Sequence, residues 1–326
     1  MKSKKGIILI SLMVSVLLLL IKFTAYFITQ SNAILTDAAE SIVNVIAVSF
    51  AFYSIHLSSL PKDENHPYGH GKVEFFSAFL EGVLIALAGA VIFGKAIYNI
   101  FYPEELKELL SGAGLVAVTG VINGALGYYM KVQGKSQKSI TIEADGKHLL
   151  SDAWSSFALV VGIFLIWLTG YAWLDILISI GLSIFIVFSG YKLIRVSVGG
   201  LMDESDVEVV QQVVDILELN KQPDWIDIHN LRIQRYGEFV HIDCHVTLPY
   251  YYDLVKAHKV VSSIDHRINS ELVSTEFFIH SDPCLPQCCH YCNMPNCFVR
   301  KEPKSKDIVW TVQNVTKNMK HFEQEG

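Results

Sequence analysis

The chain has 326 residues, of which 51% are hydrophobic, and its formal net charge is −6 at pH 7. This apolar content excludes an ordinary soluble protein, and the acidic balance gives no reason to expect a nucleic-acid partner. The apolar residues fill the first 200 positions, whereas charged residues gather after Met202. We therefore expect a membrane domain over residues 1–202, followed by a water-facing part.

The membrane domain is predicted from apolar runs, since a membrane-spanning helix needs about 20 such residues. Six runs qualify, at residues 6–28, 33–58, 73–101, 111–131, 146–169 and 173–197. The first is too long for a cleavable signal peptide and lacks a small-residue cleavage site. Lys22, inside it, either snorkels to the membrane surface or pairs with an acidic group. The pattern predicts an all-α domain of six helices.

The loops between the runs alternate in charge. The basic segments are the N-terminus, the loop with Lys62 and Lys72, and the loop with Lys131, Lys135 and Lys138. Because Lys and Arg favour cytoplasmic loops, we expect a multi-pass protein of the cell membrane with both termini in the cytoplasm. Cysteines after the last run would then be thiols or metal ligands rather than disulfides.

The second and fifth runs share a polar pattern that is costly in a bilayer. Residues 37–44 read DAAESIVN and residues 145–152 read DGKHLLSD, so both fit Asp-x-x-ligand-x-x-x-ligand. These offsets lie on one face of a helix, and four N/O ligands suit a tetrahedral divalent metal. The candidate ligands are Glu40, Asn44, His148 and Asp152. We expect Asp37 and Asp145, one turn away, to support the ligands or carry protons. Single polar residues also serve as interhelical hydrogen bonds, but the matched spacing favours a metal site.

The loop DENHPYGHGK, residues 63–72, carries a second ligand-like pattern. Asp63, His66 and His70 are spaced for ligation, and the Pro and Gly residues indicate a tight turn. A polar loop at the membrane edge is the alternative interpretation.

The motifs LTDAAESIVN, DENHPYGHGK and ADGKHLLSDAWSS together resemble those of the cation diffusion facilitator family, which exports zinc and related metals. The resemblance runs from LLLLIK at 17–22 to HSDP at 280–283. It implies a homodimer, a transport site formed by the four ligands above, and a loop site at Asp63, His66 and His70. Zinc members usually have Asp or His, then Asp, at the positions of Glu40 and Asn44. Manganese members share the Asn but lack the His, so the metal's identity stays open.

The water-facing part shows shorter elements. Helical periodicity covers residues 205–219 and 251–272, and strand-like alternation covers 227–237, 238–248 and 275–283. This αββαβ order predicts a small α+β domain over residues 203–283 with its helices on one face. By resemblance it is a cytoplasmic, metallochaperone-like domain that pairs in the dimer.

The resemblance also implies a cytoplasmic metal site in this domain. Its residues are His229, His245, His258, His280 and Asp282. His241, His266 and His321 have no such match, and we treat them as ordinary. Lys72 and Asp203 are expected to form a charge pair that ties the two domains, the alternative being two solvated loop charges.

Five of the six cysteines fall in CLPQCCHYCNMPNC, residues 284–297, a segment absent from the family pattern. Cys289-x-x-Cys292 has chelating spacing, and thiolates favour Zn, Cu(I) or Fe–S. The candidate ligands are Cys284, Cys288, Cys289, His290, Cys292 and Cys297. A structural zinc is our first interpretation; a regulatory or metal-receiving site, and a thiol tail without metal, remain open. We expect Cys244 in the core and an amphipathic helix over 305–322 in the region 284–326.

Metal ligands must be deprotonated, so protonation releases metal. The paired ligands therefore predict a secondary transporter that exchanges a divalent cation for protons. We expect Zn²⁺, with Fe²⁺, Co²⁺, Mn²⁺ or Cd²⁺ as alternatives, and metal, protons, membrane lipid and a second copy as partners. A membrane-anchored metal sensor would not need paired ligands on two spans. An enzyme would need an open metal position and a base, and no HExxH, catalytic triad or phosphate loop occurs in the sequence.

Overall fold

The computed structural model describes residues 3–29, 32–102, 109–169, 173–237, 239–272 and 275–325. The chain divides into two compact units, residues 1–202 and 203–326.

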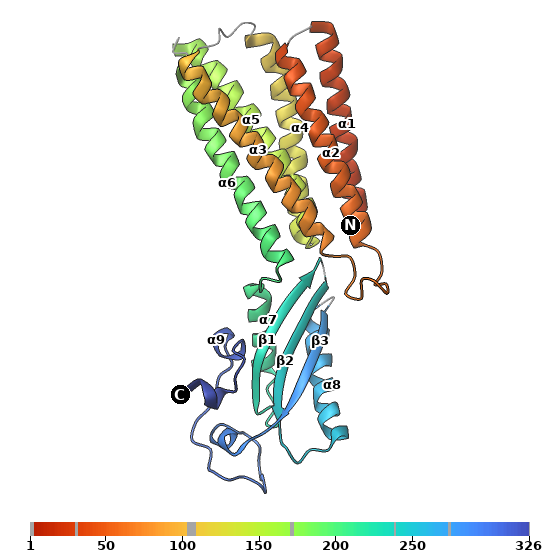
Figure 1. Cartoon of the computed structure of the whole chain (residues 1–326), viewed down its shortest axis with the longest axis vertical. Helices are drawn as coiled ribbons and strands as arrows, with labels where there is room; N and C mark the ends of the chain where they lie inside the picture. Colours follow the sequence, from red (N-terminus) through yellow and green to blue (C-terminus); the bar gives the residue numbers. More distant parts are fainter. Residues whose placement is uncertain are drawn as a thin grey trace. The chain divides into compact units, whose positions relative to one another are not determined.

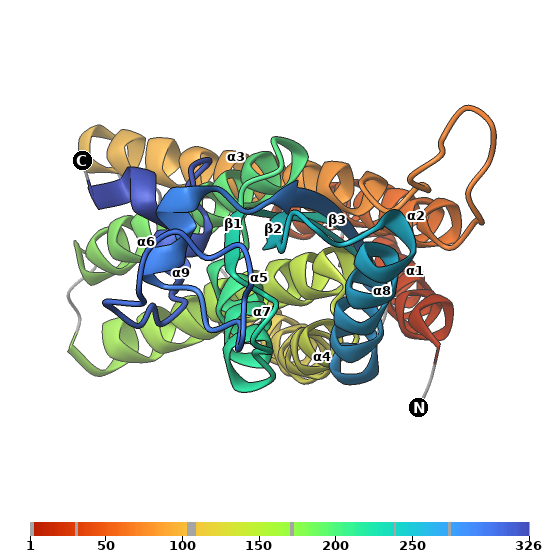
Figure 2. The same ribbon diagram turned by 90° about the horizontal axis from the view of Figure 1, so that it is seen from below.

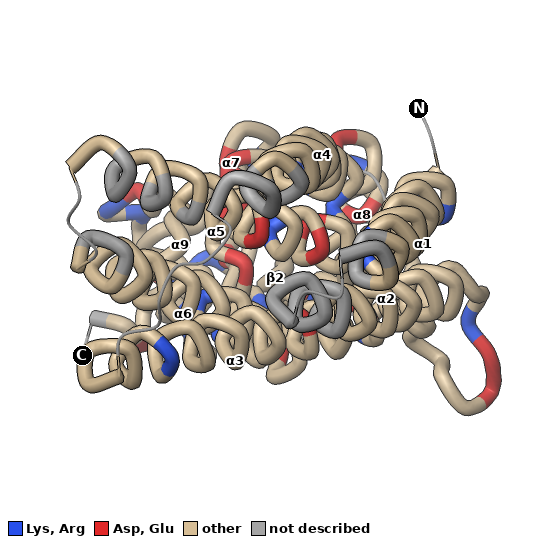
Figure 3. Tube along the Cα trace, turned by 90° about the horizontal axis from the view of Figure 1, so that it is seen from above, with Lys and Arg blue, Asp and Glu red and all other residues tan. Residues whose placement is uncertain are grey.

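Over its described residues the first unit contains six long helices (Figure 1), in agreement with the predicted fold class. They are α1 (Lys4–Thr29), α2 (Asn32–Ser58), α3 (Val73–Phe101), α4 (Leu109–Ser136), α5 (Ile140–Thr169) and α6 (Trp173–Leu201). Within the described residues, stretches long and apolar enough to cross a membrane occur in α1, α2, α3 and α6. Most of the trace of these helices is neither acidic nor basic (Figure 3). The few charged side chains within the unit therefore need an explanation.

Small residues allow α4 and α5 to approach closely. A Cβ atom on Gly146 of α5 would lie 2.6 Å from the backbone nitrogen of Lys131, and one on Gly127 of α4 would lie 2.9 Å from that of Leu150. Such contacts leave no room for a side chain, and small residues at helix crossings are typical of membrane bundles. This crossing fixes the part of α5 that carries Asp145 and His148.

The second unit has the predicted αββαβ order (Figure 1). Its elements are α7 (Val207–Leu219), β1 (Asp227–Tyr236), β2 (Phe239–Leu248), α8 (Leu254–Glu271) and β3 (Thr275–Pro283). The sheet order is β1-β2-β3, with β1 antiparallel and β3 parallel to β2. Both helices lie on the same side of the sheet (Figure 2).

Strand alternation separates an apolar face from a polar face of this sheet. Ile242 and Val246 of β2 are fully buried in the core that also contains Ile264 of α8. The intervening residue His245 points to the face without helices, where it is aligned with His229 of β1 and with its neighbour on β3, His280. The histidines of all three strands therefore meet on one face.

The C-terminal region differs from the predicted amphipathic helix. It contains the short 3₁₀ turns η1 (Pro286–His290) and η2 (His321–Glu325), and only four residues of α-helix in α9 (Val312–Val315). Trp310 is buried in the core from an irregular stretch, and its backbone N–H donates to Glu218 of α7 at 3.0 Å. The β-branched residues Ile308, Val309 and Thr311 have weak helix propensity. Packing on α7 therefore replaces the helix.

Candidate metal centres

The first candidate centre lies between α2 and α5. Asn44 donates its side-chain N–H to Asp152 Oδ2 at 3.2 Å, and its Oδ1 lies 3.0 Å from Nε2 of His148. The same His148 nitrogen is 3.8 Å from Asp152 Oδ2. Three of the four predicted ligands thus meet, as the shared helical face required. The side chains of Glu40 and Asp37 lie outside the described residues.

A residue that the sequence reasoning missed, Glu81 of α3, adjoins this centre. Its side chain is 1% exposed, and among the described residues neither carboxylate oxygen has a hydrogen-bond partner. Oε2 lies 3.8 Å from Nδ1 of His148, so the imidazole stands between Glu81 and the Asn44–Asp152 pair. At 3.8 Å the contact is an ion-pair distance rather than a hydrogen bond, and it involves the ring nitrogen of His148 that does not face Asn44.

Asp145, one turn before His148, is also buried but has a different partner. Ser11 of α1 donates its hydroxyl to Asp145 Oδ2 at 2.8 Å. Asp145 therefore connects α1 to the helix that carries the ligands.

The second candidate centre is the loop between α2 and α3. Asp63 Oδ1 lies 3.0 Å from Nδ1 of His66, and Asp63 Oδ2 lies 3.3 Å from Nε2 of His70. Gly69, with φ of +88°, makes the turn that returns the chain to His70. Desolvation would raise the pKa of Asp63, but hydrogen bonds from His66 outweigh it and lower the pKa. The carboxylate form, which metals bind, is thus favoured.

The third candidate centre occupies the helix-free face of the sheet in the second unit. Three imidazoles surround the Asp282 carboxylate of β3. Asp282 Oδ2 lies 3.3 Å from His229 Nε2 and 3.4 Å from His245 Nδ1. Asp282 Oδ1 lies 3.4 Å from His280 Nε2. Burial lowers the pKa of His229, which favours the neutral imidazole that metals bind. The prediction that His258 belongs to this cluster is not supported. His258 is exposed on α8, and α8 packs on the opposite side of the sheet from the cluster.

Asp227, at the start of β1, was not identified from the sequence. It is fully buried, 3.8 Å from His229 Nδ1. Burial would raise its pKa, but the hydrogen bonds and charge of His321 outweigh burial and lower it. His321 contacts it through Nδ1 at 2.6 Å and the backbone N–H at 2.9 Å, and Tyr291 donates its hydroxyl at 3.0 Å. His321, which we expected to be ordinary, thus anchors the chain end beside the histidine cluster.

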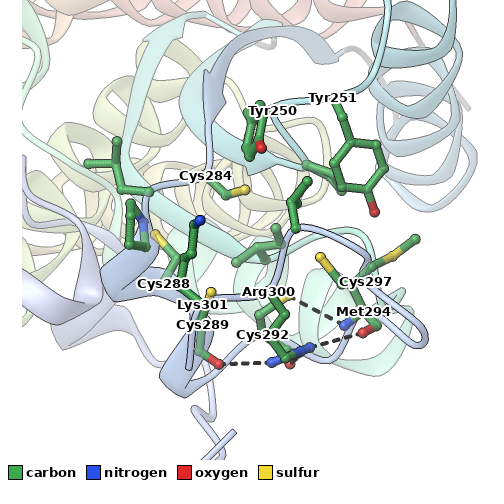
Figure 4. A pocket seen from close by; sticks show the side chains of 15 residues that line it. Tyr250, Tyr251, Cys284, Cys288, Cys289, Cys292, Met294, Cys297, Arg300 and Lys301 are labelled. Atoms are coloured by element: carbon green, nitrogen blue, oxygen red, sulfur yellow. Dashed lines mark hydrogen bonds between the residues drawn. The ribbon is translucent and has the colours of Figure 1, made fainter. Parts of the chain in front are cut away.

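The cysteine segment lies at the end of the same unit. Cys284, Cys288, Cys289, Cys292 and Cys297 line one cavity (Figure 4), and all six cysteines of the chain are free thiols. His290 is not among the lining residues; its Nε2 lies 2.6 Å from Glu302. Cys244, as expected, is buried in the sheet core, where burial raises its pKa. Lys72 and Asp203 belong to different units, so their predicted charge pair stays a prediction.

Comparison with known proteins agrees with this architecture. The family model for the cation efflux transmembrane domain matches residues 8–202, and that for the cation efflux protein cytoplasmic domain matches residues 206–284. An uncharacterized transporter of Synechocystis sp. is 32% identical over 263 residues, which cover 81% of this chain and 85% of that protein. The cation-efflux pump FieF of Yersinia pestis is 27% identical over 269 residues, or 82% of this chain and 89% of that protein.

A bundle of long apolar helices that matches the cation efflux transmembrane domain, followed by a unit that matches the cytoplasmic domain, identifies a membrane cation transporter. The chain belongs to the cation efflux family, the cation diffusion facilitators. Nothing in this family assignment calls for enzymatic chemistry.

Proposed function

We propose that the chain exports a divalent metal cation, Zn²⁺ foremost, from the cytoplasm in exchange for protons, and that it acts as a homodimer. The observation that carries this proposal is the convergence of Asn44, His148 and Asp152 from two helices within 3.0–3.8 Å. Glu40, four residues before Asn44, would complete the set on the same helical face.

The donor set favours zinc without excluding its neighbours. A site with an imidazole beside carboxylate and amide oxygens suits Zn²⁺ and Fe²⁺ better than it suits Mn²⁺, because Mn²⁺ prefers oxygen ligands only. Asn44 is neutral, so the ligand set carries one negative charge fewer than it would with aspartate. Fe²⁺, Co²⁺, Mn²⁺ and Cd²⁺ are therefore the competitors to test.

Exchange for protons follows from the chemistry of the ligands. Asp152 and His148 bind a cation only when deprotonated, so a proton arriving at either one weakens binding. In our proposal the site loads from the cytoplasm and releases the metal outward as protons enter. The basic loops support our proposal that both termini lie in the cytoplasm.

The remaining centres have separate roles in this proposal. The Asp63 loop is proposed to bind metal at the membrane edge. The Asp282 cluster is proposed to bind metal in the cytoplasmic unit and to tighten the pairing of two chains. The charge pair of Lys72 and Asp203 is proposed to connect the two units of each chain.

The proposal is tested by metal flux in sealed vesicles that contain the purified chain. We expect Zn²⁺ uptake that depends on an imposed proton gradient in the wild type and is lost in Asp152→Ala. Glu143→Gln is the matched control on α5, because Glu143 pairs only with Lys147 one turn away among the contacts found for it. Normal proton-coupled uptake by Asp152→Ala would overturn the proposed site. Competition by Fe²⁺, Co²⁺, Mn²⁺ and Cd²⁺ against Zn²⁺ uptake ranks the five metals by preference. The same competition with Asn44→Asp tests how Asn44 sets that ranking.

A further inference from the structure

The cysteine segment has no part in the transport cycle proposed above. It follows β3, and Cys284 is attached to the sheet by its backbone N–H, which donates to the carbonyl of Leu248 at 2.9 Å. The cavity that the cysteines line measures about 190 Å³. The presence of five thiols around one cavity favours metal binding, since thiolates are common ligands of zinc and of iron–sulfur clusters.

The spacing selects four of the five thiols. Cys284-x₄-Cys289-x₂-Cys292 repeats the spacing by which plant-type ferredoxins hold a cluster, and Cys289-x₂-Cys292 alone is the chelating spacing of zinc sites. Cys297, after a further four residues, provides the fourth thiolate. A Cys₄ set is the usual complement for either occupant.

Cys288 is the thiol that this choice leaves out, and its surroundings agree. It is 1% exposed and is the most buried member of an apolar cluster that also contains Ile226, Tyr291 and Cys292, with Cys284 packed against it. Cys288 therefore behaves as a core residue that holds the turn against the domain.

The backbone around the other thiols is already organised. The Arg300 guanidinium donates to the carbonyls of Cys289 and Cys292, each at 3.1 Å, and of Met294 at 3.0 Å (Figure 4). The Met294 backbone N–H donates to Cys292 Sγ at 3.5 Å. N–H groups directed at sulfur and a nearby cation both stabilise bound thiolates, and supporting contacts of this kind orient ligands in metal sites.

We propose that Cys284, Cys289, Cys292 and Cys297 form a resident tetrathiolate metal centre, distinct from the exported ion. Within the described residues no three cysteine sulfurs lie within 4.8 Å of one another. A tetrahedral zinc site with Zn–S bonds of about 2.3 Å holds its sulfurs about 3.8 Å apart. The cysteine sulfurs are therefore farther apart than a bound Zn²⁺ would hold them, and binding Zn²⁺ would draw them together. In an iron–sulfur cluster each thiolate binds one iron atom, and thiolates on different iron atoms lie farther apart than those on a single zinc ion.

The test measures metal retained by the full chain, purified anaerobically in detergent and dialysed against a weak chelator. To remove the other centres, it is run in an Asp152→Ala, Asp63→Ala, His245→Ala background. We expect about one zinc per chain, or iron with acid-labile sulfide and visible absorption, as for a Cys₄ site. The Cys289→Ser, Cys292→Ser variant is expected to lose it, and Cys288→Ala, the matched control, to keep it.

Two further measurements distinguish the loss of a metal ligand from misfolding of the variant. Cys297→Ser changes a partly exposed loop residue, so its metal loss is read beside an unchanged thermal unfolding curve. Co²⁺ loaded into the zinc form should give sulfur-to-cobalt charge-transfer absorption. Metal retained equally by the cysteine variants, or a wild type that retains neither zinc nor iron, overturns this centre. Proton-coupled zinc flux in vesicles is measured separately, so failure here leaves the proposed function standing.

Discussion

Replacing Glu81 by glutamine tests whether the buried carboxylate of α3 positions His148 for metal. The change keeps the shape of the side chain and removes its charge, 3.8 Å from His148 Nδ1. In the metal-bound state we expect Nδ1–H to donate to Glu81, which leaves Nε2 free to bind the cation beside Asn44. Losing such an orienting partner typically weakens metal binding by about 10–100-fold.

That factor corresponds to about 1.4–2.7 kcal/mol. It is smaller than the roughly 4 kcal/mol that Coulomb's law gives for two unit charges 4 Å apart at an effective dielectric constant of 20, because the metal-binding imidazole is neutral and Glu81 meets only the partial charge of its N–H group. The carboxylate therefore contributes through orientation and partial charge together.

The assay is zinc uptake by proteoliposomes over a range of zinc concentrations. We expect the Glu81→Gln variant to raise KM by about 10–100-fold while the maximal rate changes less. Glu81→Asp, which keeps the charge on a shorter side chain, should restore part of the affinity. A KM for Glu81→Gln within twofold of the wild type, with normal incorporation into vesicles, would refute the positioning role.

Three further outcomes are expected. Asp63→Asn should weaken zinc binding at the loop by about tenfold or more, measured by isothermal titration in an Asp152→Ala, His245→Ala, Cys289→Ser, Cys292→Ser background, and unchanged binding heat would remove the loop as a site. Asp227→Asn should lower the free energy of unfolding of the cytoplasmic unit by about 1.5–3 kcal/mol through weakened charge-assisted hydrogen bonds, seen as earlier thermal unfolding; an unchanged curve contradicts this. Gly127→Val should force α4 and α5 apart and abolish folded yield, whereas Gly94→Val, where a Cβ meets no atom within 4 Å, should be tolerated.

The elements were predictable because their patterns are long and local. The α7 and β3 bounds follow the 3.6- and 2-residue periods closely. The predicted tail helix failed because its apolar residues also fit an irregular path: Trp310 and Val315 reach the core of the sheet without a continuous helix. Periodicity does not reveal which partner surface a segment will meet.

The candidate centres divide in the same way. His148 and Asp152 were found because two ligands one turn apart leave a signature in one helix. Glu81 left none: it has no ligand-type residue one turn away on its helix, and only the packing of α3 against α5 reveals its neighbour. Asp227 and His321 are 94 residues apart, so no local pattern connects them.

The buried carboxylate of Asp227 is shared between two parts of the chain that could each hold metal. One oxygen faces His229, while the other accepts a hydrogen bond from Tyr291, the residue directly before Cys292. A rearrangement of the thiols would therefore reposition Tyr291. This would alter the hydrogen bond to Asp227 and, through that carboxylate, the electric field at His229. Asp227 thus connects the histidine cluster to the cysteine loop. Metal binding at one of the two sites should therefore change the metal affinity of the other.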